Sequence, residues 1–504
     1  MRRVVGVLIA LCLALVLPAC GTGGGAKTDE TKRAAGLVPK DALAYVSVDI
    51  NPSDAQKSHV ASILEKFPKI QRKTFDSEKD QLLGMAVSKL GLNYETDVKP
   101  WLGSELALAV LPDTPEPDPV ALIKSSDDAK AKPALEKAVA RPDADATYRL
   151  IKGFAVVVPK KHANLLDVIA RQADDPASAL SEQDKFTRVV NQLHDDRLLV
   201  AWADGHGLVE LAKAAIARTA GRAQFNLAAL PNVGMAALDV HAEDNALAMA
   251  GLVETPGTSG GGDTKLTGAL PENSLGAITA WNLGGGIDDL LRTVLSTNAQ
   301  ITNAFQRAQQ QIGLDIRQDI LSWMHGETVI VAGPPTAGTI PDFALVVSPT
   351  DKTKAQAAVT KIATLLEHRV GVKLDQRPAP GGGTEYVFPA AIRQGIQPAM
   401  ALLSDKFILA SSPEYLATLA KGGGGFDSGS AFKNTLDSAK SGTQFQMVLQ
   451  LSSIRNYVET LLTGASKARY DRDVKPWVDH LDAAALRVRK DGSLTRFEAK
   501  ATVK

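Results

Sequence analysis

The sequence predicts an α+β protein built from two tandem, similar α+β domains, with mainly antiparallel sheets and helices packed on one face. Three observations lead to this prediction. Short runs rich in β-branched residues often follow one another without an intervening helix, which favours antiparallel pairing. Other runs are separated by segments with apolar residues three and four apart, as in amphipathic helices. Finally, signatures of the first half recur in the same order in the second half, which indicates an internal duplication.

Residues 1–19 have the layout of a secretory signal peptide. Arg2 and Arg3 precede an apolar run, Val4 to Leu17, of 14 residues, shorter than the roughly 20 that span a membrane as a helix. The following Leu17-Pro18-Ala19-Cys20 resembles the lipobox of bacterial lipoprotein precursors. That resemblance implies cleavage before Cys20 and fatty acyl chains, such as palmitate, on this residue. The alternatives are an uncleaved membrane anchor and an ordinary secretion signal with an incidental cysteine.

We therefore expect a protein at the extracytoplasmic face of the cell membrane, attached through lipid on Cys20. The 45% hydrophobic and 22% charged residues are ordinary for a globular body. The full sequence has 56 basic and 56 acidic residues, and loss of Arg2 and Arg3 with the leader leaves about two more acidic than basic residues, which gives no electrostatic reason to expect nucleic acid as a partner. Because Cys12 belongs to the leader and Cys20 carries lipid, the mature body has no thiol for disulfides, catalysis or metal binding.

Residues 20–36 are predicted to form the lipidated N-terminus and a flexible tether, because glycine and charged residues dominate them. The first domain, residues 37–254, is expected to open with a strand at 42–50. Turn and capping residues at 51–54 then predict a helix that runs to about Phe67. The other elements expected in this domain are helices at 81–90, 127–141, 163–172, 184–193 and 208–218, and strands at 105–111, 120–123, 147–151, 154–158, 197–203, 234–240 and 246–253.

Residues 255–268 are rich in Gly, Ser, Thr and Pro and are predicted to link the domains, so that the second domain spans 269–504. Its landmarks repeat those of the first. Trp101 corresponds to Trp323, and residues 343–362 align on 120–139 without a gap, which matches Ser125 with Ser348 and Asp128 with Asp351. Residues 407–420 parallel 154–169, and residues 484–488 parallel 236–240. The alternative is chance similarity between two α+β domains of like composition.

Two blocks of the first domain, together with the second copy, resemble a bacterial envelope family known only as domain of unknown function 3352. The opening block has Pro39, Asp41, Ala42, Ala44, Tyr45, Val48 and Asp49, and the second block runs from Asp97 to Ala109. The resemblance covers most of residues 37–504. It implies an exported protein, often lipidated or membrane-anchored. It implies no activity, cofactor or catalytic residue.

The eight histidines are scattered singly, without a metal-ligand spacing on a helix, and surface positions are expected for them. They are His59, His162, His194, His206, His241, His325, His368 and His480. The nearest acid–imidazole clusters, His194-Asp195-Asp196 and Asp204-Gly205-His206, flank a predicted strand, where turn chemistry explains their polarity. No metal or cofactor site is predicted.

For three other patterns, the surrounding sequence argues against a functional interpretation. Gly257-Thr258-Ser259-Gly260-Gly261 has the letters of a nucleophile elbow but lacks the strand and helix that must flank one. The glycine runs 381–383 and 422–425 lack the remaining residues of a phosphate-binding loop. Trp101 and Trp323 are predicted to pack in the core rather than to form a sugar-binding platform, and Trp202 and Trp281 likewise.

Two functions remain open. The first is a non-catalytic binding or scaffold protein of the bacterial cell envelope, whose partner beyond the membrane would be a lipid, a glycan or a protein. The alternative is an envelope hydrolase whose active site is assembled from distant segments. No catalytic residue is assigned. A deep pocket with converging His, Asp/Glu or Ser side chains would favour the hydrolase.

Overall fold

The computed structural model describes residues 33–67, 75–112, 117–219, 233–255, 260–297, 299–336, 338–390, 396–436 and 441–504. The predicted signal peptide and Cys20 lie outside these residues. The chain divides into two compact units. Unit 1 runs to Gly257 and includes Ser493–Glu498 and Val503, and unit 2 holds the remainder. The described strands pair in antiparallel fashion and helices pack against them, so the predicted α+β class is confirmed.

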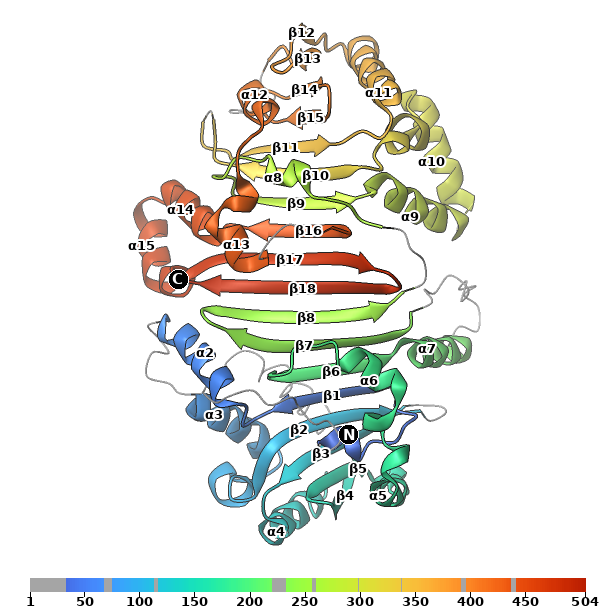
Figure 1. Ribbon diagram of the computed structural model, residues 1–504, viewed down its shortest axis with the longest axis vertical. Helices are drawn as coiled ribbons and strands as arrows, with labels where there is room; N and C mark the ends of the chain where they lie inside the picture. The colour runs from blue at the N-terminus through green and yellow to red at the C-terminus, as the bar shows by residue number, and fades with distance from the viewer. Residues whose placement is uncertain are drawn as a thin grey trace. The chain divides into compact units, whose positions relative to one another are not determined.

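The sheet of unit 1 has the strand order β4-β5-β3-β2-β1-β6-β7-β8, coloured blue to green in Figure 1. Its strands are β1 (Ala44–Asp49), β2 (Leu102–Leu111), β3 (Asp118–Ser125), β4 (Ala146–Ile151), β5 (Phe154–Pro159), β6 (Leu199–Asp204), β7 (Met235–Glu243) and β8 (Ala246–Glu254). Its α-helices are α2 (Asp54–Glu65), α3 (Phe75–Ser88), α4 (Asp128–Val139), α5 (Leu165–Asp174), α6 (Asp184–Val190) and α7 (Gly205–Thr219). Shorter helical turns are η2 (Ala34–Gly36), η3 (Tyr94–Val98), η4 (Lys160–His162), η5 (Pro176–Ser178) and η6 (Leu180–Glu182).

The sheet of unit 2 has the order β12-β13-β14-β15-β11-β10-β9-β16-β17, and the last strand, β18, follows β17 in a hairpin. Its strands are β9 (Gly276–Trp281), β10 (Glu327–Gly333), β11 (Asp342–Val347), β12 (Asp375–Pro378), β13 (Thr384–Val387), β14 (Ala399–Leu402), β15 (Phe407–Ala410), β16 (Thr443–Leu449), β17 (Leu481–Asp491) and β18 (Leu494–Val503). Its α-helices are α8 (Lys265–Gly268), α9 (Leu283–Thr297), α10 (Ala299–Ile312), α11 (Lys352–Leu365), α12 (Pro413–Lys421), α13 (Ser430–Leu436), α14 (Leu451–Leu461), α15 (Gly464–Asp473) and α16 (Lys475–Val478). Its shorter turns are η8 (Ile316–Ile320), η9 (Leu321–Trp323), η10 (Leu366–Val370) and η11 (Phe426–Ser428).

The two strand orders correspond. Strands β14, β15, β11, β10, β9, β16 and β17 follow one another in unit 2 as β4, β5, β3, β2, β1, β6 and β7 do in unit 1. Unit 2 carries the hairpin β12–β13 in addition, at the edge next to β14. In each unit the first strand lies between the second strand and a later one: β1 lies between β2 and β6, and β9 lies between β10 and β16.

Helices cover both faces of each sheet, so the prediction that they pack on one face is wrong. On β1, Tyr45 lies in a core with α5 and α6, whereas Val48 lies in a second core with α3 and α4. In unit 2, Val346 and Val347 are divided in the same way between cores with α12–α13 and with α11. Successive side chains of a strand point to opposite faces, so continuous apolar runs are the signature of two-sided burial. The run from Leu106 to Leu111 is an example.

Two segments that were predicted to be flexible are partly built into the cores. Ala34 and Ala35, at the end of the predicted tether, are fully buried, and the Ala34 N–H donates to the Glu105 carboxylate at 3.1 Å. At the end of the predicted linker, the N–H groups of Leu266 and Thr267 donate to Glu327 at 2.7 and 3.0 Å. A buried glutamate thus holds the entry segment of each unit. Composition misses this because, among the described residues, only two small residues are buried in each segment, Ala34 and Ala35 in the first and Thr264 and Thr267 in the second.

A five-residue π-turn precedes the tryptophan of each unit. The Trp101 indole N–H donates to the Asp97 carbonyl at 2.6 Å, and the Trp323 indole N–H donates to the Asp319 carbonyl at 2.8 Å. Both side chains are nearly fully buried, and so is Trp202, which confirms the prediction that these residues pack in the core. Trp281 is only partly buried.

The predicted gapless match between the units is wrong by one residue. Asp127 caps α4 by accepting from the Lys130 N–H, and Asp351 caps α11 by accepting from the Lys354 N–H. Asp127, not Asp128, therefore corresponds to Asp351. The backbone agrees, because the N–H groups of Ser126 and Thr350 donate to the carbonyls of Trp101 and Trp323 respectively. The gapless match instead lays Phe343, which is 49% exposed, on Val120, which is 1% exposed.

Candidate functional site

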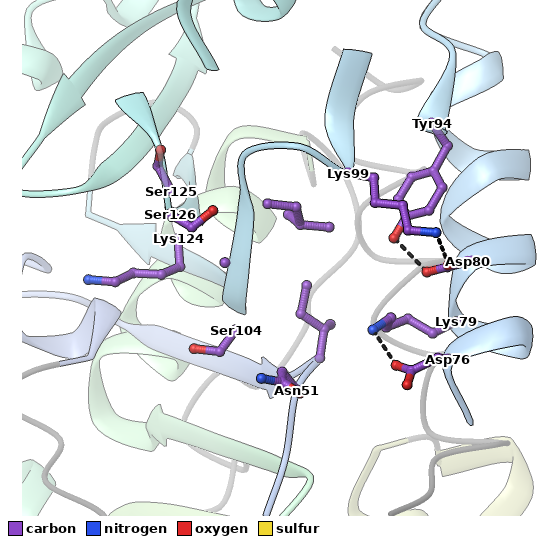
Figure 2. Close-up of a pocket in the computed structure, with 13 residues that line it drawn as sticks. Asn51, Asp76, Lys79, Asp80, Tyr94, Lys99, Ser104, Lys124, Ser125 and Ser126 are labelled. Atoms are coloured by element: carbon purple, nitrogen blue, oxygen red, sulfur yellow. Dashed lines mark hydrogen bonds and ion pairs between the residues drawn. The ribbon is translucent and has the colours of Figure 1, made fainter. Parts of the chain in front are cut away.

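A cavity of about 650 Å³ lies in unit 1, between α3, the π-turn η3 and the ends of β1, β2 and β3. This volume is within the range of small-molecule binding sites. In Figure 2 one wall carries charged side chains from α3 and η3, and the strand ends contribute an amide and hydroxyl groups. The uncharged polar groups are those of Asn51, Ser104, Ser125 and Ser126.

The charged wall consists of two lysine–aspartate pairs. Lys79 Nζ lies 2.7 Å from Asp76 Oδ1, and Lys99 Nζ lies 2.7 Å from Asp80 Oδ2. Lys99 also reaches Glu95, at 3.0 Å. Each cation that faces the cavity is therefore matched by a carboxylate on the same wall.

Hydrogen bonds keep the second pair in its charged form. Burial alone would raise the pKa of Asp80, but hydrogen bonds from Lys99 and from the Tyr94 hydroxyl outweigh it, and the pKa is lowered. Hydrogen bonds to Asp80 and Glu95 raise the pKa of Lys99. Burial, followed by the hydrogen bond to Asp80, raises the pKa of Tyr94 well above its usual range. These three groups are shifted away from neutrality, not towards it.

The two remaining polar groups near the strand ends differ in what they offer. Lys124 lines the cavity, but its ammonium lies 4.3 Å from the centre of the Phe154 ring and points away from the charged wall in Figure 2. Ser125 is 92% buried, since its relative exposure is 8%. Its hydroxyl has no hydrogen-bond partner among the residues that the structure describes.

Local sequence explains how the walls are positioned. Asn93 caps the π-turn by accepting from the Thr96 N–H, and the Asp97 carboxylate accepts in return from the Asn93 N–H at 2.8 Å. This reciprocal cap fixes the turn that carries Lys99. At Gly103 a Cβ would lie 2.9 Å from the Lys124 carbonyl oxygen, so the absence of a side chain lets β2 approach β3 beside the cavity.

Unit 2 has the same π-turn but different side chains on it. Counting from the matched tryptophans, Tyr94 corresponds to Ile316 and Lys99 to Leu321. The Tyr94 and Lys99 side chains are therefore particular to unit 1 and are not required to form the turn. Unit 2 has a polar cavity of its own beside its π-turn, about 500 Å³ in volume, whose lining includes Asp315, Arg317 and Lys361. Sequence reasoning missed the cavity of unit 1, although the contrast between Lys99 and Leu321 in otherwise matching blocks was a signal that could have found it.

The structure gives one histidine a role that the sequence did not predict. His241 is 6% exposed, not at the surface, and its Nδ1 lies 2.6 Å from Asp239 Oδ1 while its Nε2 lies 3.3 Å from Glu243 Oε1. The His194 ring stacks on it with centroids 4.1 Å apart. The sequence contained a signal for this cluster, because residues 239, 241 and 243 are spaced two apart and therefore lie on the same face of β7. Asp239 is fully buried and also accepts from the His194 backbone N–H.

The other predicted candidates do not converge with these groups. Asp204 pairs with Lys185 at 3.1 Å and accepts from the Gly207 N–H, while His206 is exposed. In the nucleophile-elbow pattern, residues 257–259 lie outside the described residues. The glycine runs 381–383 and 422–425 lie in connections, with left-handed backbone at most of their positions. In the described parts of the chain, no group of three or more potential ligands could hold a metal ion. Within the same residues, no helix combines the length and apolarity of a membrane span.

Comparisons with known proteins identify a family but no function. The family model described as "Protein of unknown function (DUF3352)" matches residues 3–444. No curated protein matches the chain. Among solved structures, crystal form IV of TP0453 is 10% identical, with a TM-score of 0.24 over 45% of this chain and 76% of that one. Crystal form III of TP0453 is 9% identical, with a TM-score of 0.23 over 47% of this chain and 93% of that one. Scores of this size carry no inference.

Proposed function

This chain belongs to the DUF3352 family of proteins of unknown function, and we propose that it is a lipid-anchored, extracytoplasmic binding or scaffold protein without catalytic activity. The observation that carries the proposal is the polar cavity of unit 1. Its lysines and aspartates are paired with each other, while Asn51, Ser104 and Ser126 expose an amide and two hydroxyl groups across the cavity. Such a site is suited to hold a polar ligand.

Binding fits the cavity better than hydrolysis does. General acid–base catalysis is most efficient when the catalytic group titrates near the working pH. Here the pKa values of Asp80, Lys99 and Tyr94 are all displaced from neutrality by their mutual hydrogen bonds and by burial. These groups can orient a ligand, but they are poorly suited to exchange protons with it.

The membrane attachment rests on the amino-terminal sequence. Lipid on Cys20 would be followed by a spacer of residues 21–32, after which Ala34 is held in unit 1 by Glu105. Twelve residues span at most about 40 Å when fully extended. The cavity would then remain within reach of molecules near the outer surface of the membrane.

The two similar units are best explained as an internal duplication. The support consists of the shared strand order, the π-turn with its buried tryptophan, the capping aspartates and the buried glutamates Glu105 and Glu327. In this view one ancestral unit supplied the scaffold, and unit 1 acquired or kept the polar cavity.

Thermal unfolding in the presence of candidate ligands tests the binding function. The full chain, purified in a mild detergent, would be heated alone and with neutral saccharides, inorganic phosphate or phosphocholine. A ligand at a hundred times its dissociation constant stabilises the folded state by about 2.7 kcal/mol. We therefore expect at least one of these probes to raise the Tm by a few degrees. An unchanged Tm with every probe would contradict a small-molecule binding function.

A further inference from the structure

We propose that the cavity of unit 1 binds a neutral, hydroxyl-rich ligand, that is, a saccharide of the cell envelope. This inference rests on the binding function proposed above and specifies the ligand. It follows from three features of the described residues: the balance of charge in the cavity, the kinds of hydrogen-bonding group exposed there, and the contrast with unit 2.

The charge balance disfavours an ionic ligand. The two ammonium groups on the charged wall face two carboxylates, each pair being joined at 2.7 Å. A phosphate or carboxylate that approached Lys79 or Lys99 would also approach Asp76 or Asp80, and a cationic ligand would meet the reverse problem. Either ligand would have to break a pair or accept a like charge nearby, and both changes cost free energy. A neutral ligand avoids this cost.

The hydrogen-bonding groups match hydroxyls. An alcohol donates one hydrogen bond and accepts others, so it can donate to a carboxylate and accept from an ammonium in the same pair. Ionised carboxylates offer about four acceptor positions, and Asp80 retains capacity beyond its bonds with Lys99 and Tyr94. Across the cavity, Asn51, Ser104 and Ser126 are exposed and can act as donors and acceptors.

The comparison with unit 2 separates ligand recognition from folding. The π-turn forms with Ile316 and Leu321 in the places of Tyr94 and Lys99, so the fold tolerates an apolar residue at each position. Lys99 is also 46% exposed, and the turn beneath it is fixed by Asn93 and Asp97. The turn therefore does not require a lysine at this position, and unit 2 supplies the substitution that tests its role in binding.

Titration calorimetry on the full chain provides the test, in a detergent whose head group is not a sugar. The probes are glucose, galactose, mannose and N-acetylglucosamine, with inorganic phosphate and phosphocholine as charged comparisons. We expect a saccharide to bind with little dependence on salt. Lys99→Leu removes a charged donor, so it should weaken binding about tenfold. Ser126→Ala removes an exposed hydroxyl that lines the cavity, so it should weaken binding severalfold.

Lys137→Leu is the matched control. Lys137, on α4, places its Nζ 2.7 Å from Oδ2 of Asp97, which lies on the same π-turn that carries Lys99. Lys137 does not line the cavity. This variant should bind saccharide as the parent does, and all three variants should keep the parent's Tm within a few degrees. Two results would overturn the saccharide assignment: phosphate or phosphocholine binding in preference to every sugar, or equal affinities for Lys99→Leu and Lys137→Leu. If phosphate or phosphocholine bound in preference to every sugar, the proposed binding function would still hold. If none of the probes bound, both the binding function and the saccharide assignment would be contradicted.

Discussion

At the scale of single residues, the most informative group is His241. Burial alone would lower its pKa, but hydrogen bonds to Asp239 and Glu243 outweigh burial and raise the pKa to about 9. The folded state therefore holds the proton more tightly than the unfolded chain, whose histidine titrates at 6.5. The resulting stabilisation is complete below pH 6.5 and disappears as the pH rises through 9. A shift of this size corresponds to about 3 kcal/mol.

Chemical denaturation as a function of pH measures this effect. Between pH 6.5 and 9, the parent protein should lose about 3 kcal/mol more unfolding free energy than His241→Gln, which has no titrating group at this position. Taking the difference between the two proteins cancels the titration of groups that they share. Parallel curves would mean that His241 is not held in its charged form.

The same residues show what sequence reasoning could not reach at this scale. The sequence analysis placed His241 at the surface, and its partners were missed because the strand predicted at 234–240 ends before His241 and Glu243. His194, 47 positions earlier, stacks on it because β6 and β7 are adjacent. The residues that line the cavity also come from five separate segments, so no single local motif in the sequence predicts the cavity.

At the scale of elements, the helix caps distinguish the observed correspondence from the one predicted from sequence. Asp127 and Asp351 accept N–H groups at the starts of α4 and α11. Removing an N-cap side chain destabilises a helix. We therefore predict that Asp127→Ala and Asp351→Ala each lower the Tm by a few degrees, whereas Asp128→Ala, one residue inside α4, leaves it nearly unchanged. Calorimetric unfolding checks this, and a larger effect for Asp128→Ala would restore the gapless match.

The types of the elements were easier to predict than which of their faces are buried. Strand and helix types followed from β-branched runs and from helical spacing, and antiparallel pairing followed from strands that succeed one another directly. The side on which helices pack did not follow, since it depends on tertiary contacts. A gapless sequence match also hid an offset of one residue, which exchanges the two faces of a strand. Phe343 against Val120 illustrates the consequence, because one is half exposed and the other buried.

At the scale of the whole molecule, the sequence predicts two similar α+β units and a membrane anchor, but only the units fall within the described residues. The described ends of the predicted tether and linker are held by the fold, because Ala34 and Thr267 are hydrogen-bonded to buried glutamates that lie far away in the sequence. Long-range contacts of this kind leave no mark in composition. The leader, in contrast, is predicted from local order alone, in the sequence Arg2, Arg3, the apolar run and Cys20.

The central claim is that lipid on Cys20 holds a binding protein at the outer surface of a bacterial membrane. Mass spectrometry of the amino-terminal peptide, from protein purified out of membranes, tests this claim most directly. We predict a peptide that begins at Cys20 and carries the mass of acyl chains, together with unprocessed, unlipidated precursor in a Cys20→Ala variant. A mature peptide that retains residues 1–19, or one with a free thiol at Cys20, would contradict the claim.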